Sequence, residues 1–133
     1  MSAQGQVVTG VDFVCIPTTD LEAAMTFYGD VLGLERSSVW QGSGTDPVGA
    51  EFETGSLTLA LLNNAALGID FSPSNVPIAL RVDDVEAARS ELESRGVSFD
   101  ADTLDSGVCH QAFFKDPDGN RLALHHRYAP RKA

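Results

Sequence analysis

The feature of this 133-residue sequence that most constrains its fold is an internal repeat. The stretch VCIPTTDLEAA, residues 14–24, matches IALRVDDVEAA, residues 78–88, at a separation of 64 residues. At the same separation Gly55 corresponds to Gly119, and an apolar segment follows each glycine. Because such a repeat indicates that one supersecondary unit is built twice, we expect two similar halves.

The first half predicts a strand, a helix and three more strands. Residues 11–17 are a short apolar and β-branched run, and Pro17 stops it because proline has no amide hydrogen for a ladder. Thr19 or Asp20 can cap a helix, and apolar residues then recur at helical spacing until Gly33. Three strand-like runs separated by Gly, Ser, Asp and Pro follow, at residues 34–40, 48–54 and 56–62.

The second half repeats this order. A strand at residues 77–82 precedes a helix that begins at Asp83 or Asp84 and ends at Arg95, before Gly96. Three further strands are expected near residues 97–100, 108–115 and 120–127.

These patterns predict a single α+β domain made of two βαβββ units. The units span residues 10–66 and 76–128, and residues 67–75 have the Gly, Pro, Ser and Asn content of a linker. In each unit the helix covers one face of a short sheet and leaves the other face bare. Two units side by side then form a curved sheet around a groove, which is the expected ligand site.

Two stretches make the chain resemble a known family. DLEAAMTFYGDVLGL, residues 20–34, and DPDGNRLAL, residues 116–124, together with the paired units, look like the vicinal oxygen chelate superfamily. Its members include glyoxalase I, extradiol dioxygenases, fosfomycin-resistance enzymes and bleomycin-resistance proteins. The resemblance covers almost the whole chain and is specific for the fold, but the members range from lyases to proteins that only bind a drug.

In the metal-dependent members, each unit supplies two metal ligands, one from its first strand and one from its last. The resemblance places these positions at Phe13 and Ala123, and the repeat places their mates at Pro77 and Leu59. These side chains carry no lone pair, whereas protein-bound divalent ions require imidazole, carboxylate or thiolate ligands. We therefore expect no metal and no other cofactor, and we expect the chemistry that depends on the ion to be absent.

The histidines of the last hairpin are a second candidate feature. If DPDG forms a two-residue loop, His110 lies opposite His125. His125 then shares a face with Ala123 and points into the groove, whereas His126 points away. The pair, with Cys15 from the first strand, would suit a displaced metal or acid–base catalysis. The alternatives are a hydrogen bond to a ligand, or no role beyond the polar end of the groove.

Aromatic residues complete the candidate site. Trp40, the only tryptophan, can stack on a flat or cationic ligand, although packing in the core or rim explains it equally well. Phe52 and the adjacent Phe113 and Phe114 suit a core, but alternation points one of the adjacent pair into the groove. No catalytic nucleophile is identified. The predicted ligand-binding residues are Phe13, Cys15, Trp40, Phe52, Leu59, His110, Phe114, Ala123 and His125.

Charge and composition exclude several partners. Nineteen acidic residues against nine basic ones give a net charge of −10, which disfavours nucleic acid and would attract a cationic small molecule. No apolar run approaches the roughly 20 residues that cross a bilayer. The sequence also lacks the pattern of a secretory signal, and its two cysteines do not form a disulfide framework, so we expect a cytoplasmic protein.

Together these features favour a metal-free, bleomycin-resistance-like protein. It would bind or sequester a small organic ligand, such as a cationic or aromatic antibiotic, in an apolar groove, as a homodimer. The alternative is a lyase, isomerase or dioxygenase of this superfamily that uses a non-standard site at His110 and His125. A third reading is a regulatory or scaffold protein with a vestigial groove.

Overall fold

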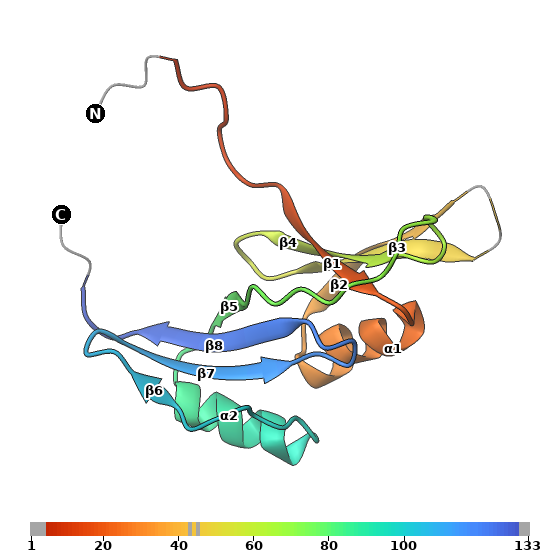
Figure 1. Ribbon diagram of the computed structural model, residues 1–133. Coiled ribbons are helices and arrows are strands. Elements are labelled where there is room, and N and C mark those ends of the chain that lie inside the picture. The colour runs from red at the N-terminus through yellow and green to blue at the C-terminus, as the bar shows by residue number, and fades with distance from the viewer. Residues whose placement is uncertain (1–4, 43, 45, 131–133) are drawn as a thin grey trace.

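The computed structural model describes residues 5–42, 44 and 46–130, which form two four-stranded sheets with the helices on one side (Figure 1). The first unit contains β1 (Phe13–Thr18), α1 (Leu21–Thr26), the π-helical segment η1 (Phe27–Val31), β2 (Glu35–Gln41), β3 (Pro47–Glu53) and β4 (Thr58–Asn63). The second unit contains β5 (Ile78–Arg81), α2 (Val85–Ser94), β6 (Leu104–Asp105), β7 (Cys109–Lys115) and β8 (Arg121–Arg127).

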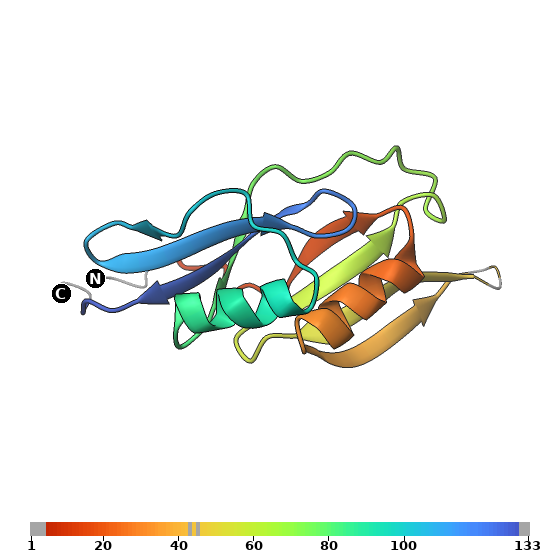
Figure 2. The ribbon, with the colours of Figure 1, turned by 90° about the horizontal axis from the view of Figure 1, so that it is seen from below.

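The two sheets have the same topology. Their strand orders are β1-β4-β3-β2 and β5-β8-β7-β6. In each sheet the first strand of the unit runs parallel to the last strand, and the other pairs are antiparallel. Figure 2 shows α1 and α2 end to end beneath the two sheets. The predicted α+β fold of paired βαβββ units is therefore confirmed.

Both helices begin where the repeat predicts. Asp20 and Asp84 are the N-caps, and each carboxylate accepts a hydrogen bond from the backbone N–H three residues later, at 3.1 and 3.0 Å. The first helix continues as η1, and a π-helical turn adds a residue to a helix. The separation between equivalent positions accordingly falls from 64 at the caps to 63 at Gly33 and Gly96, which end the helices with φ of 78° and 95°. No helix in the described ranges is long and apolar enough to cross a membrane.

The prediction of a strand near residues 97–100 is wrong. Phe99 makes only an isolated bridge with Phe114, and β6 lies further along the chain. The hydroxyl of Thr103 bonds to Glu86 and accepts a hydrogen bond from Arg89, and both partners belong to α2. The segment thus touches the sheet edge only at Phe99 and Asp100, whose backbone N–H donates to the Phe113 carbonyl at 2.8 Å, and then follows the helix.

The core lies between the sheets and the helices and is continuous across both units. Tyr28 is fully buried, and its ring lies 5.3 Å from that of Phe27 and 6.3 Å from that of Phe52. Phe27 also meets Phe114 of the second unit, with 6.5 Å between ring centroids. The Tyr28 hydroxyl donates a 2.7 Å hydrogen bond to the buried Asp116 carboxylate, which joins the units at a polar point inside an apolar core.

The turn after β7 is also bonded to the end of β1. Asp118 accepts hydrogen bonds from the Thr18 hydroxyl at 2.5 Å and from the backbone N–H of Thr19 at 2.9 Å. Asn120 donates to the Pro17 carbonyl at 2.8 Å and is almost fully buried. Polar groups of the DPDG turn therefore fix how the two units sit against each other.

Candidate functional site

Each sheet has one face that no helix covers, and these faces are the candidate binding surfaces. Side chains alternate along each strand, so the residues between core positions lie on the uncovered face. The first open face, on the sheet of β1–β4, includes Phe13, Cys15, Trp40, Glu51, Glu53 and Ala60. The second open face, on the sheet of β5–β8, includes Arg81, Gln111, Phe113, Arg121, Ala123, His125 and Arg127.

Trp40 dominates the first open face. Its indole N–H donates a 2.8 Å hydrogen bond to the Glu51 carboxylate. Its ring lies over Gly49, where an added Cβ would come within 2.6 Å of both the ring and the Leu61 carbonyl oxygen. Only glycine at this position allows the ring to lie so close to the sheet. The indole is thus held flat over the sheet, next to a carboxylate.

The second open face combines an aromatic ring with cationic groups. Phe113 pairs with Ala123, and the Arg121 guanidinium lies over the Phe113 ring, 5.3 Å from its centroid. His125 lies between Gln111 on β7 and Arg81 on β5. Sequence analysis counted Phe114 as the groove-facing residue of the adjacent pair. The structure places Phe114 in the core and Phe113 on the open face.

The predicted hairpin register is wrong by one residue, because the loop closes between Asp116 and Asn120. His110 therefore lies opposite His126, not His125, and on the other face. There its ring contacts Asp105, with Nε2 3.3 Å from a carboxylate oxygen. His125 shares the open face with Ala123, as predicted, but the acid–base pair suggested for an enzyme is not assembled.

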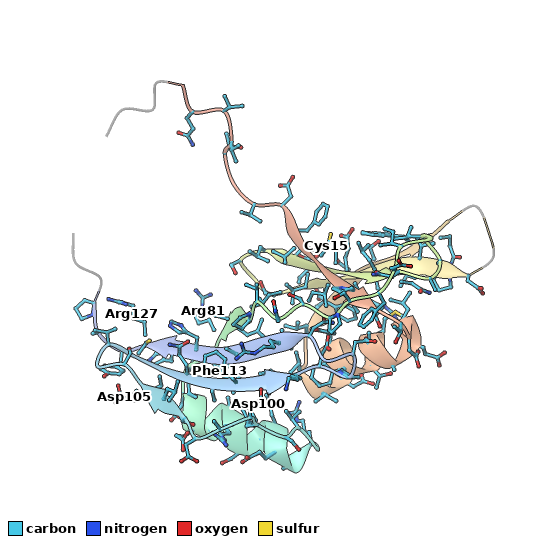
Figure 3. All side chains as sticks on the ribbon, in the orientation of Figure 1. Cys15, Arg81, Asp100, Asp105, Phe113 and Arg127 are labelled. Atoms are coloured by element: carbon cyan, nitrogen blue, oxygen red, sulfur yellow. The ribbon has the colours of Figure 1, made fainter. Side chains whose placement is uncertain are left out.

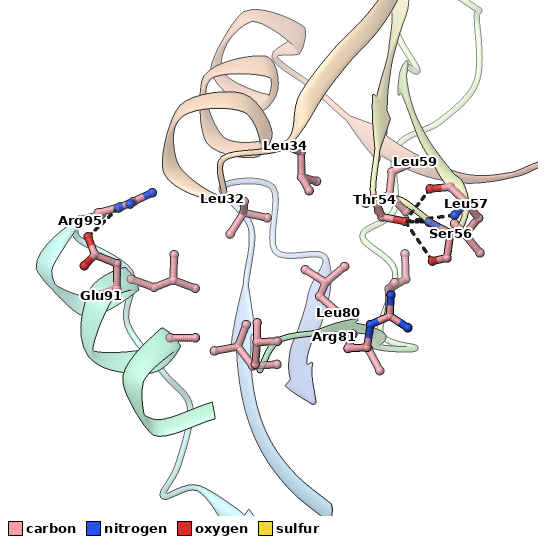
Figure 4. Close-up of a pocket in the computed structure, with 16 residues that line it drawn as sticks. Leu32, Leu34, Thr54, Ser56, Leu57, Leu59, Leu80, Arg81, Glu91 and Arg95 are labelled. Carbon is pink, nitrogen blue, oxygen red and sulfur yellow. Dashed lines mark hydrogen bonds and ion pairs between the residues drawn. The ribbon is translucent and has the colours of Figure 1, made fainter. Parts of the chain in front are cut away.

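A cavity of about 500 Å³ lies between the two units on the helix side (Figure 4). Leu32, Leu34, Leu59 and Leu80 point into it, and the Glu91–Arg95 ion pair lies at its edge. The repeat explains why it exists. The helix positions equivalent to Phe27 and Tyr28, whose rings pack at the junction between the units, carry Glu91 and Leu92.

Comparison with known proteins agrees with this architecture. Residues 10–124 match the family model of the Glyoxalase/Bleomycin resistance protein/Dioxygenase superfamily.

The chain belongs to this superfamily.

Solved structures of the superfamily cover nearly the whole chain. TnmS3, an antibiotic binding protein from Streptomyces sp. CB03234, is 26% identical with a TM-score of 0.75, covering 92% of this chain and 98% of that one. A glyoxalase/bleomycin resistance protein from the same organism is also 26% identical, with a TM-score of 0.70 and coverage of 88% and 100%. Lactoylglutathione lyase from Agrobacterium tumefaciens is 18% identical, with a TM-score of 0.73 and coverage of 90% and 94%, which shows the shared fold. No curated protein matches the chain.

The metal positions of the superfamily can now be compared with the structure. Phe13, Pro77 and Ala123 belong to the uncovered side of their strands, but Leu59 is in the core. Because equivalent positions in β4 and β8 are 63 residues apart, the mate of Ala123 is Ala60. None of these five side chains can donate electrons to a metal ion. In the described residues, no three His, Cys, Asp or Glu side chains gather as a metal site. The chain therefore does not fit the metal of the superfamily.

Five of the nine predicted ligand-binding residues lie on the open faces of the sheets, and four do not. Phe13, Cys15, Trp40, Ala123 and His125 lie on the open faces, whereas Phe52, Leu59, Phe114 and His110 do not. Whether any of them binds a ligand stays a prediction. Sequence reasoning missed Glu51, Arg81, Phe113 and Arg127 on these faces. A correct hairpin register would have identified Phe113 and Arg127, because alternation fixes the rest of each strand.

Proposed function

We propose that the protein binds a small aromatic molecule on its open faces, without a metal, and sequesters it. The observation that carries this proposal is the indole of Trp40, half-buried on the uncovered face of its sheet, where it lies over Gly49 and donates a hydrogen bond to Glu51. An indole in this arrangement suits stacking on a planar ligand, and the neighbouring carboxylate suits a cationic substituent. A relative described as an antibiotic binding protein supports an antibiotic as the ligand.

Burial of apolar surface supplies the binding energy in this proposal. Each Å² of apolar ligand surface removed from water contributes about 25 cal/mol. Phe13 and Phe113 add aromatic contact area on the two faces. The site of a metal-dependent relative would hold an ion here, whereas these side chains offer an apolar floor.

We propose further that a homodimer encloses the ligand. A bare sheet covers only one side of a ligand, and most ligand sites bury the greater part of it. The segment before β1 is extended and apolar, with Val7 and Val8 88% and 75% exposed. In a dimer, this segment would contact the partner and help to enclose the ligand.

Fluorescence of the single tryptophan tests ligand binding. Titration with planar cationic and neutral aromatic antibiotics should quench Trp40 saturably, and prior treatment with EDTA should leave the affinity unchanged. Trp40→Phe should weaken binding about tenfold, measured by calorimetry, because base-like stacking on an indole contributes about 1–3 kcal/mol.

Two controls sharpen this experiment. Tyr128→Phe alters an exposed aromatic residue near the far end of β8 and should leave the affinity unchanged. Absence of saturable binding across the panel, or loss of binding on removal of metal, contradicts the proposed function.

A further inference from the structure

We infer that the second open face holds an anionic group of the ligand, so that the ligand class is an aromatic molecule bearing a carboxylate, phosphate or sulfonate. The inference rests on the proposed function, because it assigns the chemistry of the same site. The groups that carry it are Arg81, His125 and Arg127, called here the arginine cluster.

Strand register brings these three side chains together. Arg81 of β5 pairs directly with His125 of β8, and Arg127 follows two residues along β8 on the same face. Directly paired and next-but-one residues on one face are close enough for long side chains to reach one group. Figure 3 shows Arg81 and Arg127 on the side of β8 opposite α2. Gln111, opposite His125, adds an amide donor.

The arginine cluster has no carboxylate of its own. Arg89, Arg95 and Lys115 each form an ion pair with an acidic residue, and no such pair is found for Arg81 or Arg127 within the described ranges. The Nε of Arg127 is buried and has no hydrogen-bond partner there. A buried guanidinium nitrogen without an acceptor is unfavourable, and a bound anion would supply the acceptor.

The charge pattern also favours an anion at this place. The protein as a whole has a net charge of −10, and its field repels anions. On the second open face, however, the described strand residues include no Asp or Glu. Arginine presents donors in a planar fork that matches carboxylate, phosphate and sulfonate groups. Phe113 on the same face then contacts the aromatic body beside the anionic group.

A pair of fluorescent probes with one shared body tests the inference. 8-Anilino-1-naphthalenesulfonate carries an anionic group, and N-phenyl-1-naphthylamine is the same aromatic body without it. We expect the double variant Arg81→Gln/Arg127→Gln to bind the sulfonate probe about tenfold more weakly, because each bidentate charge-assisted contact is worth more than a neutral hydrogen bond. Its affinity for the neutral probe should equal that of the wild type.

Arg36→Gln is the matched control. Arg36 is an exposed arginine of β2 whose side chain contacts the Met25 sulfur on the helix side, so the substitution removes one positive charge, half of the change in the double variant, away from the open faces. Neither probe should change its affinity for this variant. The inference is overturned if the double variant loses less affinity for the sulfonate probe than Arg36→Gln does. It is also overturned if the double variant loses affinity for both probes equally.

The remaining outcomes separate the inference from the proposed function. If neither probe binds the wild type, the proposed function fails as well. If the wild type binds both probes with equal affinity and the double variant alters neither affinity, the proposed apolar site is supported and the anion subsite is overturned. If the double variant becomes monomeric in analytical ultracentrifugation and no longer binds either probe, the arginine cluster belongs to the subunit interface and the inference is overturned.

Discussion

At the scale of single residues, the buried Tyr28–Asp116 contact is the interaction that the rest of the junction depends on. Asp116 is 6% exposed, and its carboxylate accepts hydrogen bonds from Tyr28, from two backbone N–H groups and from the Asn120 amide. A buried carboxylate is tolerated only where donors replace its water. The tyrosine ring meanwhile fills apolar space next to Phe27 and Phe52.

Tyr28→Phe should therefore destabilise the fold by about 1–2 kcal/mol, because one acceptor of a buried carboxylate loses its donor. The matched control is Tyr128→Phe, which removes the hydroxyl bonded to the exposed Asp105 and should change stability little. Urea unfolding of the three proteins measures the difference. Equal midpoints for the two variants would contradict the role assigned to Tyr28.

The same residue predicts a pH dependence. Burial, followed by the charge of Asp116, raises the pKa of the Tyr28 hydroxyl. In the unfolded chain a tyrosine pKa is about 10, so above that pH the unfolded state releases a proton that the folded state keeps. The free energy of unfolding should therefore fall with rising pH, more steeply between about pH 9 and 11 in the wild type than in Tyr28→Phe. Parallel pH profiles would exclude this contribution.

At the scale of elements, the sequence predicted strands and helices better than their pairing. Asp20 and Asp84 were expected helix starts because a cap acts within one turn. The register of β7 and β8 depends on loop closure by Asn120, whose backbone N–H bonds to Asp116 and whose amide bonds to another unit. Composition alone does not reveal such contacts. The strand register differs from the predicted one by one position, which places His110 on the other face of the sheet.

The π-helical segment η1 carries two aromatic residues whose equivalents in the second unit do not fill the core to the same extent. One end of the core is filled by Phe27 and Tyr28, and the equivalent end, at Leu92, has about 500 Å³ of space. Leu92→Phe should raise the free energy of unfolding by about 1 kcal/mol, because the larger ring buries more apolar area in existing space.

Leu92→Ala is the opposite change and should lower the free energy of unfolding by about 2–5 kcal/mol. Thermal unfolding measures both variants. Arg81 also lines the cavity, so binding of the aromatic probes should be measured with both variants as well. A destabilised Leu92→Phe would show that the cavity walls do not accept a ring.

At the scale of the whole molecule, the repeat predicted the architecture because each copy must build the same sheet. It was less reliable for the site. A uniform separation of 64 made Leu59 the mate of Ala123, whereas the strand pairing gives a separation of 63 in β4 and β8 and makes Ala60 the mate. The open faces could be outlined from alternation, but the arginine cluster needed the pairing of Arg81 with His125, which joins strands far apart in the sequence.

The bonds between the end of β1 and the last hairpin have a consequence for biosynthesis. Thr18 finds its partner Asp118 only 100 residues later, and the Pro17 carbonyl meets Asn120 later still. A nascent chain therefore emerges from the ribosome with its first half lacking these contacts until residues 118–120 have been made. During this interval a chaperone or an incorrect partner could reach the surface of the first unit that these residues later cover.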